Sequence, residues 1–105
     1  MIDNSKYGLQ GKFNTHPGKA KELANILIEA SNLMKNVKGC HLYSVSLIRE
    51  RDNEVWVYEI WETKEDHDNS LNYPGVKELI GQAMPLLADA AEKGQELIVV
   101  AGLDQ

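Results

Sequence analysis

The stretch from Val55 to Glu62 reads Val-Trp-Val-Tyr-Glu-Ile-Trp-Glu and has the aromatic and β-branched composition of a β-strand. A strand with one solvent-exposed face alternates apolar and polar residues, but this one is apolar on both faces. One face would carry Val55, Val57 and Trp61, and the other Trp56, Tyr58 and Ile60. The fold must therefore cover both sides of this strand, with its own elements or with another chain.

A single carboxylate, Glu59, interrupts this apolar strand. Its neighbours on the same face are Val57 and Trp61, so it would lie in low-dielectric surroundings. A carboxylate there needs a hydrogen-bond partner or a proton. Glu59 is therefore either a general base with a raised pKa or a structurally paired side chain.

Length and charge restrict the class of protein. The 105 residues suit one domain, and we assign residues 5–105 to it and residues 1–4 to a short N-terminal extension. The net charge of -5, with Lys and Arg scattered among acidic residues, argues against nucleic-acid binding. Neither a signal peptide nor a membrane-spanning run is apparent, so a cytoplasmic protein without a membrane partner is expected. Cys40 is the single cysteine, and with three separated histidines it forms no recognisable metal motif.

The first half of the chain reads as strand, helix, strand. A strand is predicted from Tyr7 to Phe13, and Thr15 is a candidate N-cap for a helix that has Pro17 in its first turn. Val37-Lys38-Gly39 would end this helix, and alternation predicts a strand from His41 to Ile48. The polar turn at residues 49–53 then joins that strand to the Val55 strand as an antiparallel hairpin.

The second half reads as two helical segments and a strand. Thr63 and Asp66 resemble a capping box, which predicts a short helix from Lys64 to about Leu71. Helical spacing continues from Val76 to Ala90, with Pro85 bending it and Lys93-Gly94 stopping it. The last strand is predicted at residues 97–101, apolar on both faces.

This order of elements, βαββαβ, is typical of an α+β ferredoxin-like sandwich with a four-stranded antiparallel sheet. Right-handed crossovers place both helices on one face. The other face would expose Trp56, Tyr58 and Ile60, an apolar surface of the kind that marks association. We therefore expect a homodimer packed through the sheet face.

Three short motifs resemble the antibiotic biosynthesis monooxygenase family: Gly39-Cys40-His41-x-Tyr43, Glu59-x-Trp61-Glu62, and Leu71 followed three residues later by Pro74. The resemblance extends from about Tyr7 to Leu103 and includes the turn His16-Pro17-Gly18-Lys19. It implies a dimeric α+β barrel with a pocket between sheet and helices. It also implies, as in many members, a monooxygenase that acts on quinol-like or polycyclic phenolic substrates with dioxygen as co-substrate and no cofactor.

Such chemistry requires a substrate that becomes electron-rich on losing a proton, because dioxygen must be reduced without a cofactor. The protein supplies a dry pocket, a proton acceptor and hydrogen-bond donors for the anion. The candidate catalytic residues are Trp61, Glu59 and His67. Trp61 could form a pocket wall and donate its N–H to substrate, or serve as a core residue. His67 could face the pocket or the solvent.

The candidate substrate-binding residues are His41, Tyr43, Ser70 and Tyr73. His41 and Tyr43 are expected on one face of their strand, where they either line a cavity or pack across strands. Tyr73 precedes Pro74 and could form a lid or fix the turn. By the resemblance, many relatives carry a histidine where this chain has Ser70, and this departure argues against any histidine-based mechanism. Cys40 reads as a small buried residue.

Haem-degrading relatives need an axial histidine and a first-strand asparagine, but spacing places Ile80 and Gly11 at these positions, so haem is not expected as a substrate. The leading hypothesis is therefore a small cofactor-independent monooxygenase. The alternatives are a non-catalytic dimeric binder or sensor of a small aromatic metabolite, and a structural or regulatory dimer.

Overall fold

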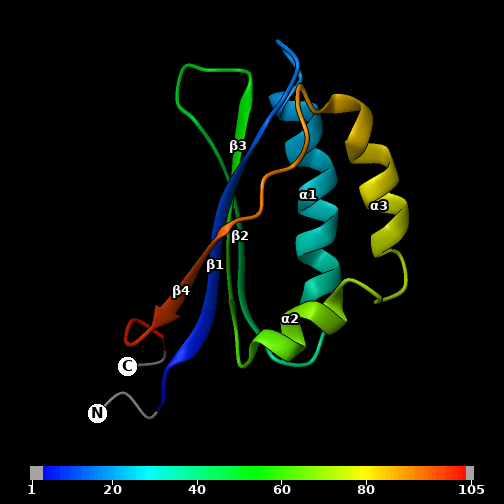
Figure 1. The fold of residues 1–105 in the computed structure, drawn as a ribbon. Helices are drawn as coiled ribbons and strands as arrows, with labels where there is room; N and C mark the ends of the chain where they lie inside the picture. Colours follow the sequence, from blue (N-terminus) through cyan, green and yellow to red (C-terminus); the bar gives the residue numbers. More distant parts are fainter. Residues whose placement is uncertain (1–3, 104–105) are drawn as a thin grey trace.

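A computed structural model describes residues 4–103, which form a four-stranded antiparallel sheet with helices on one face (Figure 1). The predicted α+β ferredoxin-like order is confirmed. The elements are β1 (Lys6–Asn14), α1 (Ala20–Met34), β2 (Cys40–Leu47), β3 (Glu54–Trp61), α2 (Lys64–Ser70), α3 (Val76–Ala83), the 3-10 turn η1 (Met84–Leu86) and β4 (Gln95–Val99). Of the predicted extension at 1–4, residues 1–3 lie outside the described residues, as do residues 104–105 of the predicted domain. No helix within residues 4–103 is both long and apolar enough to cross a membrane.

The sheet has the order β2-β3-β1-β4, so the aromatic strand β3 is central and pairs on both sides. The predicted β2–β3 hairpin is confirmed, with Tyr43 opposite Glu59 and Val45 opposite Val57. On the other side Leu9 is opposite Glu59. Directly opposed residues share a face, so Leu9, Glu59 and Tyr43 form one row on the face covered by the helices.

Two buried clusters lie between sheet and helices, at opposite ends of α1. One cluster lies at the η1 end of the molecule and consists of Ala20, Leu23, Val55 and Leu86. The other lies at the α2 end and consists of Met34, Trp61 and Val76. The two clusters thus hold both ends of α1 against the sheet.

Two predicted helix boundaries are wrong. Helix α1 begins at Ala20 with Lys19 as its N-cap, and no side chain caps it. Thr15 instead forms a β-bridge with Leu87, and its hydroxyl donates to the His16 carbonyl. Helix α3 ends at Ala83 rather than continuing to Ala90, since Pro85 lacks the N–H that the next turn needs and the chain then turns back to pair with Thr15.

The face of the sheet away from the helices carries Trp56, Tyr58 and Ile60, as predicted, but it is less apolar than expected. Their cross-strand neighbours there include Ser44, Ser46, Gln10 and Lys12. Ile60 is buried within the single chain, while Trp56 and Tyr58 are half-buried. In β4, which begins at Gln95, Ile98 pairs with Tyr7 on the helix face yet is 70% exposed, because this edge strand extends beyond the helices.

Candidate active site

A cavity of about 310 Å³ lies between the sheet and the helices α1, α2 and α3. Four polar side chains line it: Tyr43, Glu59, His67 and Ser70. The other lining residues are apolar and come from β1, α1, the residue after α2, α3, η1 and the segment after η1. Within residues 4–103, no three His, Cys, Asp or Glu side chains are grouped so that they could hold a metal ion. The cavity is large enough for a small organic ligand.

Glu59 is the carboxylate of this cavity, and its side chain is only 14% exposed. Its Oε1 accepts a hydrogen bond from Trp61 Nε1 at 3.0 Å and lies 3.9 Å from His67 Nε2. Burial raises the pKa of Glu59 above its ordinary value, and the Trp61 N–H and the His67 charge only partly oppose this. Glu59 therefore takes up a proton at higher pH than an exposed glutamate does.

His67 connects the cavity to the molecular surface. Its Nδ1 lies 2.9 Å from Oδ1 of Asp68, whose side chain is 51% exposed. When Nδ1 carries the proton and donates it to Asp68, Nε2 is a free acceptor directed toward Glu59. The imidazole is held between Trp61 and Tyr7, with ring centroids 5.9 Å and 5.7 Å away. Glu59, His67 and Asp68 thus lie in a row of titratable side chains from cavity to solvent, with 3.9 Å between Glu59 and His67 and 2.9 Å between His67 and Asp68.

Helix α2 positions His67, and two local features fix the start of this helix. Thr63 is the N-cap, and its Oγ1 accepts a hydrogen bond from the Asp66 N–H at 3.1 Å, as the capping box predicts. Gly39 has φ of +85°, and a Cβ at this position would overlap the Asp66 carboxylate. The glycine thereby lets α2 lie close to the start of β2. The motif at Gly39 therefore serves to place α2, a role that sequence reasoning missed.

Tyr43 lies opposite Glu59 on β2 and lines the same cavity. Its hydroxyl has no hydrogen-bond partner among residues 4–103. Burial, and then the nearby Glu59 charge, raise the pKa of Tyr43, so its hydroxyl stays protonated and can donate to a ligand. Ser70 also lines the cavity, but its hydroxyl donates to the backbone carbonyl of His67, which leaves only its lone pairs for a ligand.

Three of the candidate residues lie outside the cavity lining. Trp61 does not line the cavity: it is 0% exposed and its N–H is donated to Glu59, so it positions that carboxylate. His41 and Tyr43 do not share a face, because a register shift between Cys40 and Leu42 turns His41 outward, where its Nε2 lies 2.9 Å from Glu62 Oε1. Tyr73 packs against the cluster of Met34, Trp61 and Val76 and lies outside the cavity lining.

Asp68 was not identified from the sequence, although it is adjacent to His67 in a short helix and so could have been considered as its partner. Helix position alone does not say which acidic neighbour a histidine contacts. The distances select Asp68 on α2 and Glu59 on β3. The structure therefore brings Glu59, His67, Tyr43 and Ser70 together at one cavity and leaves His41 and Tyr73 outside it.

Comparisons with known proteins agree with this architecture. The model of the family described as antibiotic biosynthesis monooxygenase matches residues 7–82. A crystal structure from Chloroflexus aurantiacus, named for the same family, is 33% identical with a TM-score of 0.80, over 92% of this chain and 95% of that one. SnoaB from Streptomyces nogalater, described as a cofactor-independent oxygenase, has the same fold at 13% identity and a TM-score of 0.72, over 93% and 94% of the two chains. A search of the curated proteins finds no match.

Proposed function

Since the chain belongs to the antibiotic biosynthesis monooxygenase family, we propose that it is a cofactor-independent monooxygenase that oxidises a quinol-like or polycyclic phenol with dioxygen. The observation that carries the proposal is Glu59, a buried carboxylate with a raised pKa in a largely apolar cavity that also holds Tyr43 and His67. A base with a pKa closer to neutrality is better matched to a weakly acidic phenol than an exposed glutamate is.

In the first step Glu59 accepts the phenolic proton, and the substrate becomes an electron-rich anion. Tyr43, with its protonated hydroxyl beside Glu59, donates a hydrogen bond to the anionic oxygen. The apolar lining keeps water away, so this hydrogen bond is stronger than it would be in solution. These groups supply the base, the donor and the dry surroundings that the reaction requires.

In the second step the anion transfers one electron to dioxygen, and the two radicals combine into a peroxide at a ring carbon. For a substrate whose tautomer carries a CH2 group at this carbon, loss of water then leaves C=O. The carbon gives up four electrons, one oxygen atom enters the product, and the other leaves as water. The substrate is thus the only reductant, and the proton on Glu59 returns to the departing oxygen.

His67 manages the proton between turnovers in this proposal. Its Nε2 faces Glu59 and its Nδ1 contacts the surface residue Asp68, so a proton can pass between carboxylate and solvent through the imidazole. Excess protons are thereby exchanged without opening the cavity to water.

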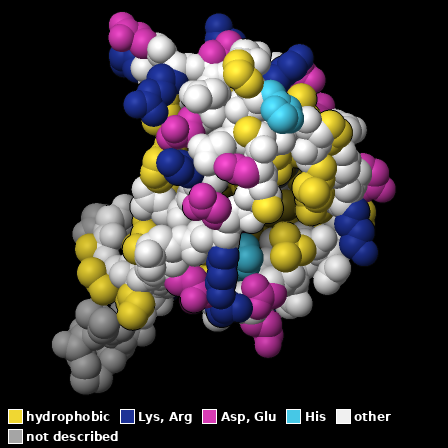
Figure 2. Space-filling view, turned by 45° about the horizontal axis from the view of Figure 1, so that its top comes forward, with side chains coloured by type: hydrophobic (Ala, Val, Ile, Leu, Met, Phe, Trp, Pro, Cys, Tyr) yellow, Lys and Arg dark blue, Asp and Glu magenta, His cyan; other side chains and the backbone are white. Residues whose placement is uncertain are grey.

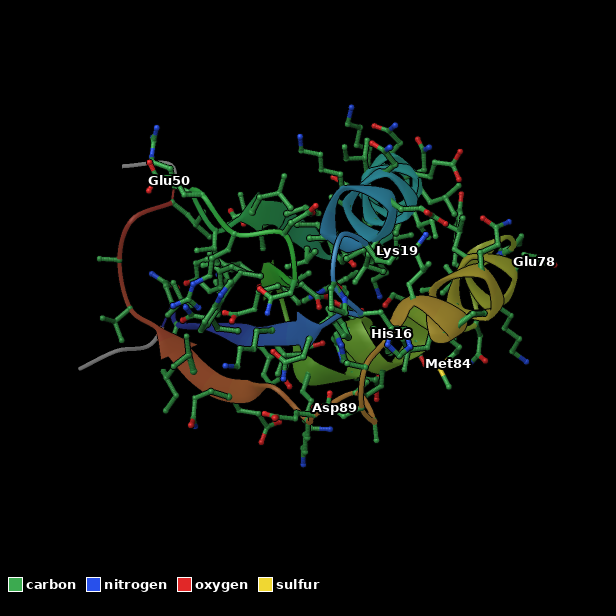
Figure 3. All side chains as sticks on the ribbon, turned by 90° about the horizontal axis from the view of Figure 1, so that it is seen from above. His16, Lys19, Glu50, Glu78, Met84 and Asp89 are labelled. Carbon is green, nitrogen blue, oxygen red and sulfur yellow. The ribbon has the colours of Figure 1, made fainter. Side chains whose placement is uncertain are left out.

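The direct test is oxygen uptake by chelator-treated protein with a panel of quinols, naphthols and anthrones. We expect uptake above autoxidation for at least one substrate, with one atom of isotopically labelled dioxygen in the product. His67→Asn should lower kcat about 10- to 100-fold, since general acid–base groups typically contribute at least this much. His16→Asn is the matched control, because His16, labelled in Figure 3, is exposed and lies outside the cavity lining, and it should leave kcat unchanged.

Two results would contradict the proposal. Uptake that never exceeds autoxidation would refute catalysis, and a ligand that raises the melting temperature without turnover would then support a small-molecule binder instead. An equal loss in the His16 and His67 variants would show that the effect is not located at the cavity.

We further propose a homodimer formed through the sheet face that carries Trp56 and Tyr58. Two large, half-buried aromatic side chains on a sheet face without helices favour association there. Trp56→Glu should shift the chain toward monomer in sedimentation velocity at micromolar concentration, whereas Ile28→Glu, at an exposed position on α1, should not. A wild-type monomer at this concentration would refute the dimer.

A further inference from the structure

The cavity is elongated, and its two ends lie far apart along the strands. Glu59 marks one end and Phe13, which is opposite Val55, marks the other. Four residues of strand separate these rows, which corresponds to about 13 Å. On α1 the lining residues run from Leu23 to Met34, a helical rise of about 16 Å. The cavity is therefore a slot parallel to α1, longer than a single aromatic ring.

The polar groups are gathered at the α2 end of this slot. Tyr43 and Glu59 are opposite each other in the sheet, and His67 and Ser70 come from α2. The η1 end is lined by aliphatic and aromatic carbon alone, from Phe13, Leu23, Ala83, Leu87 and Ala91. A ligand that fits this distribution is polar at one end and apolar over the remaining length.

Charge restricts the ligand further. Within residues 4–103 the cavity lining contains no Lys or Arg, and Glu59 is its only carboxylate. At the η1 end no charged side chain of the described residues lines the cavity, so an anionic group there would be desolvated without a counter-ion. The side chains of Leu71, Ile80 and Met84 line the cavity and are also exposed, so its mouth is apolar. Figure 2 shows a hollow flanked by hydrophobic side chains, with acidic side chains on the same face. Grouped apolar side chains at a mouth favour entry of an uncharged, apolar molecule.

We propose that the cavity binds an uncharged phenol or quinol with an apolar tail, with the phenolic head at Glu59 and Tyr43 and the tail along α1 toward Phe13 and Leu87. The oxidation of the head group rests on the proposed function, but the binding mode does not. It follows from the length of the slot, the gathering of polar groups at one end and the absence of Lys and Arg from the lining that the described residues form.

Calorimetric titration with 4-alkylphenols of increasing chain length tests this binding mode in the absence of turnover. Affinity should rise about fourfold for each added methylene, until the chain spans the slot. A matched phenol whose chain ends in a carboxylate should bind at least about tenfold more weakly than the alkylphenol of equal length. Equal affinity across the alkyl series, or tighter binding of the carboxylate, would overturn the proposal.

Two lysine variants test whether the alkyl tail of the ligand lies at the η1 end of the cavity. The segment after η1 runs beside β1, from the bridge between Thr15 and Leu87 to the close approach of Gly94 to Gly11. Ala91 lies in this segment, where it is exposed and also lines the cavity. Ala91→Lys should weaken the longest alkylphenol about tenfold and strengthen the carboxylate-ended analogue. Ala90→Lys, at an exposed position outside the lining, should change neither. Identical effects of the two lysines, with far-UV circular dichroism confirming folding, would contradict a tail at this end.

The proposed monooxygenase activity and the proposed binding mode can be refuted independently of each other. Chain-length-dependent binding without oxygen consumption would refute the proposed monooxygenase and retain the amphiphile site. Oxygen consumption with small polar quinols and no chain-length dependence would refute the amphiphile site and retain the enzyme.

Discussion

Glu59→Gln should lower kcat by about 10²- to 10⁴-fold and at the same time stabilise the protein above neutral pH. Glutamine cannot take the phenolic proton, and loss of a general base has an effect of this size. Its amide oxygen can still accept the Trp61 N–H hydrogen bond, so the local packing is retained. Removing a buried negative charge from a largely apolar cavity should raise the free energy of unfolding by about 0.5–2 kcal/mol.

The pH dependence of this gain follows from the direction of the pKa shift. Burial raises the pKa of Glu59 in the folded chain, so the folded state binds this proton more tightly than the unfolded state. The resulting stability is fully present below the ordinary glutamate pKa of 4.5 and is lost as pH rises through the folded value. Glu59→Gln should therefore match wild type near pH 4 and exceed it at pH 8 in urea unfolding.

The exposed Glu92 provides the control for this experiment. Glu92→Gln should leave both kcat and the difference in stability between pH 4 and pH 8 unchanged, since its carboxylate is solvated. A Glu59→Gln variant that keeps wild-type turnover would show that another group accepts the proton. A variant that is less stable than wild type at pH 8 would show that the Glu59 charge is compensated in the folded chain.

The order of strands and helices could be predicted because the hydrophobic patterns are long and consistent. The β2–β3 hairpin, the capping box at Thr63 and the position of Glu59 on the helix face all follow from alternation and spacing. These features depend on neighbours in sequence. Local patterns therefore sufficed for the framework of the site.

Features that depend on distant neighbours were not accessible to the same reasoning. The bulge next to Cys40 turns His41 away from Tyr43, although the strand itself alternates regularly. Helix α3 ends early because the segment around Leu87 pairs with Thr15, more than seventy residues before it. Neither the bulge nor the pairing has a sequence signal of its own. The same limitation applies to Trp61, whose partner Glu59 could be named only once their side chains had been placed.

Trp61→Phe should shift the acid limb of the kcat/KM profile to higher pH. The indole N–H donates to Glu59 Oε1 and stabilises the charged carboxylate, so it holds the pKa of Glu59 below the value that burial alone would give. Phenylalanine lacks this donor, and the pKa of Glu59 should rise further. Because Trp61 is fully buried and the smaller ring leaves a void, unfolding should also become easier by about 1–3 kcal/mol.

The profile also separates a positioning role from direct contact with substrate. If Trp61 acts only through Glu59, kcat/KM should recover to near the wild-type value at pH well above the shifted limb. A loss that persists at every pH would instead support the contact with substrate that the sequence had suggested. Trp56→Phe is the matched control, because Trp56 donates to Glu54 at 2.9 Å on the opposite face of the sheet. It removes the same type of hydrogen bond without touching the cavity, so its pH profile should coincide with that of wild type.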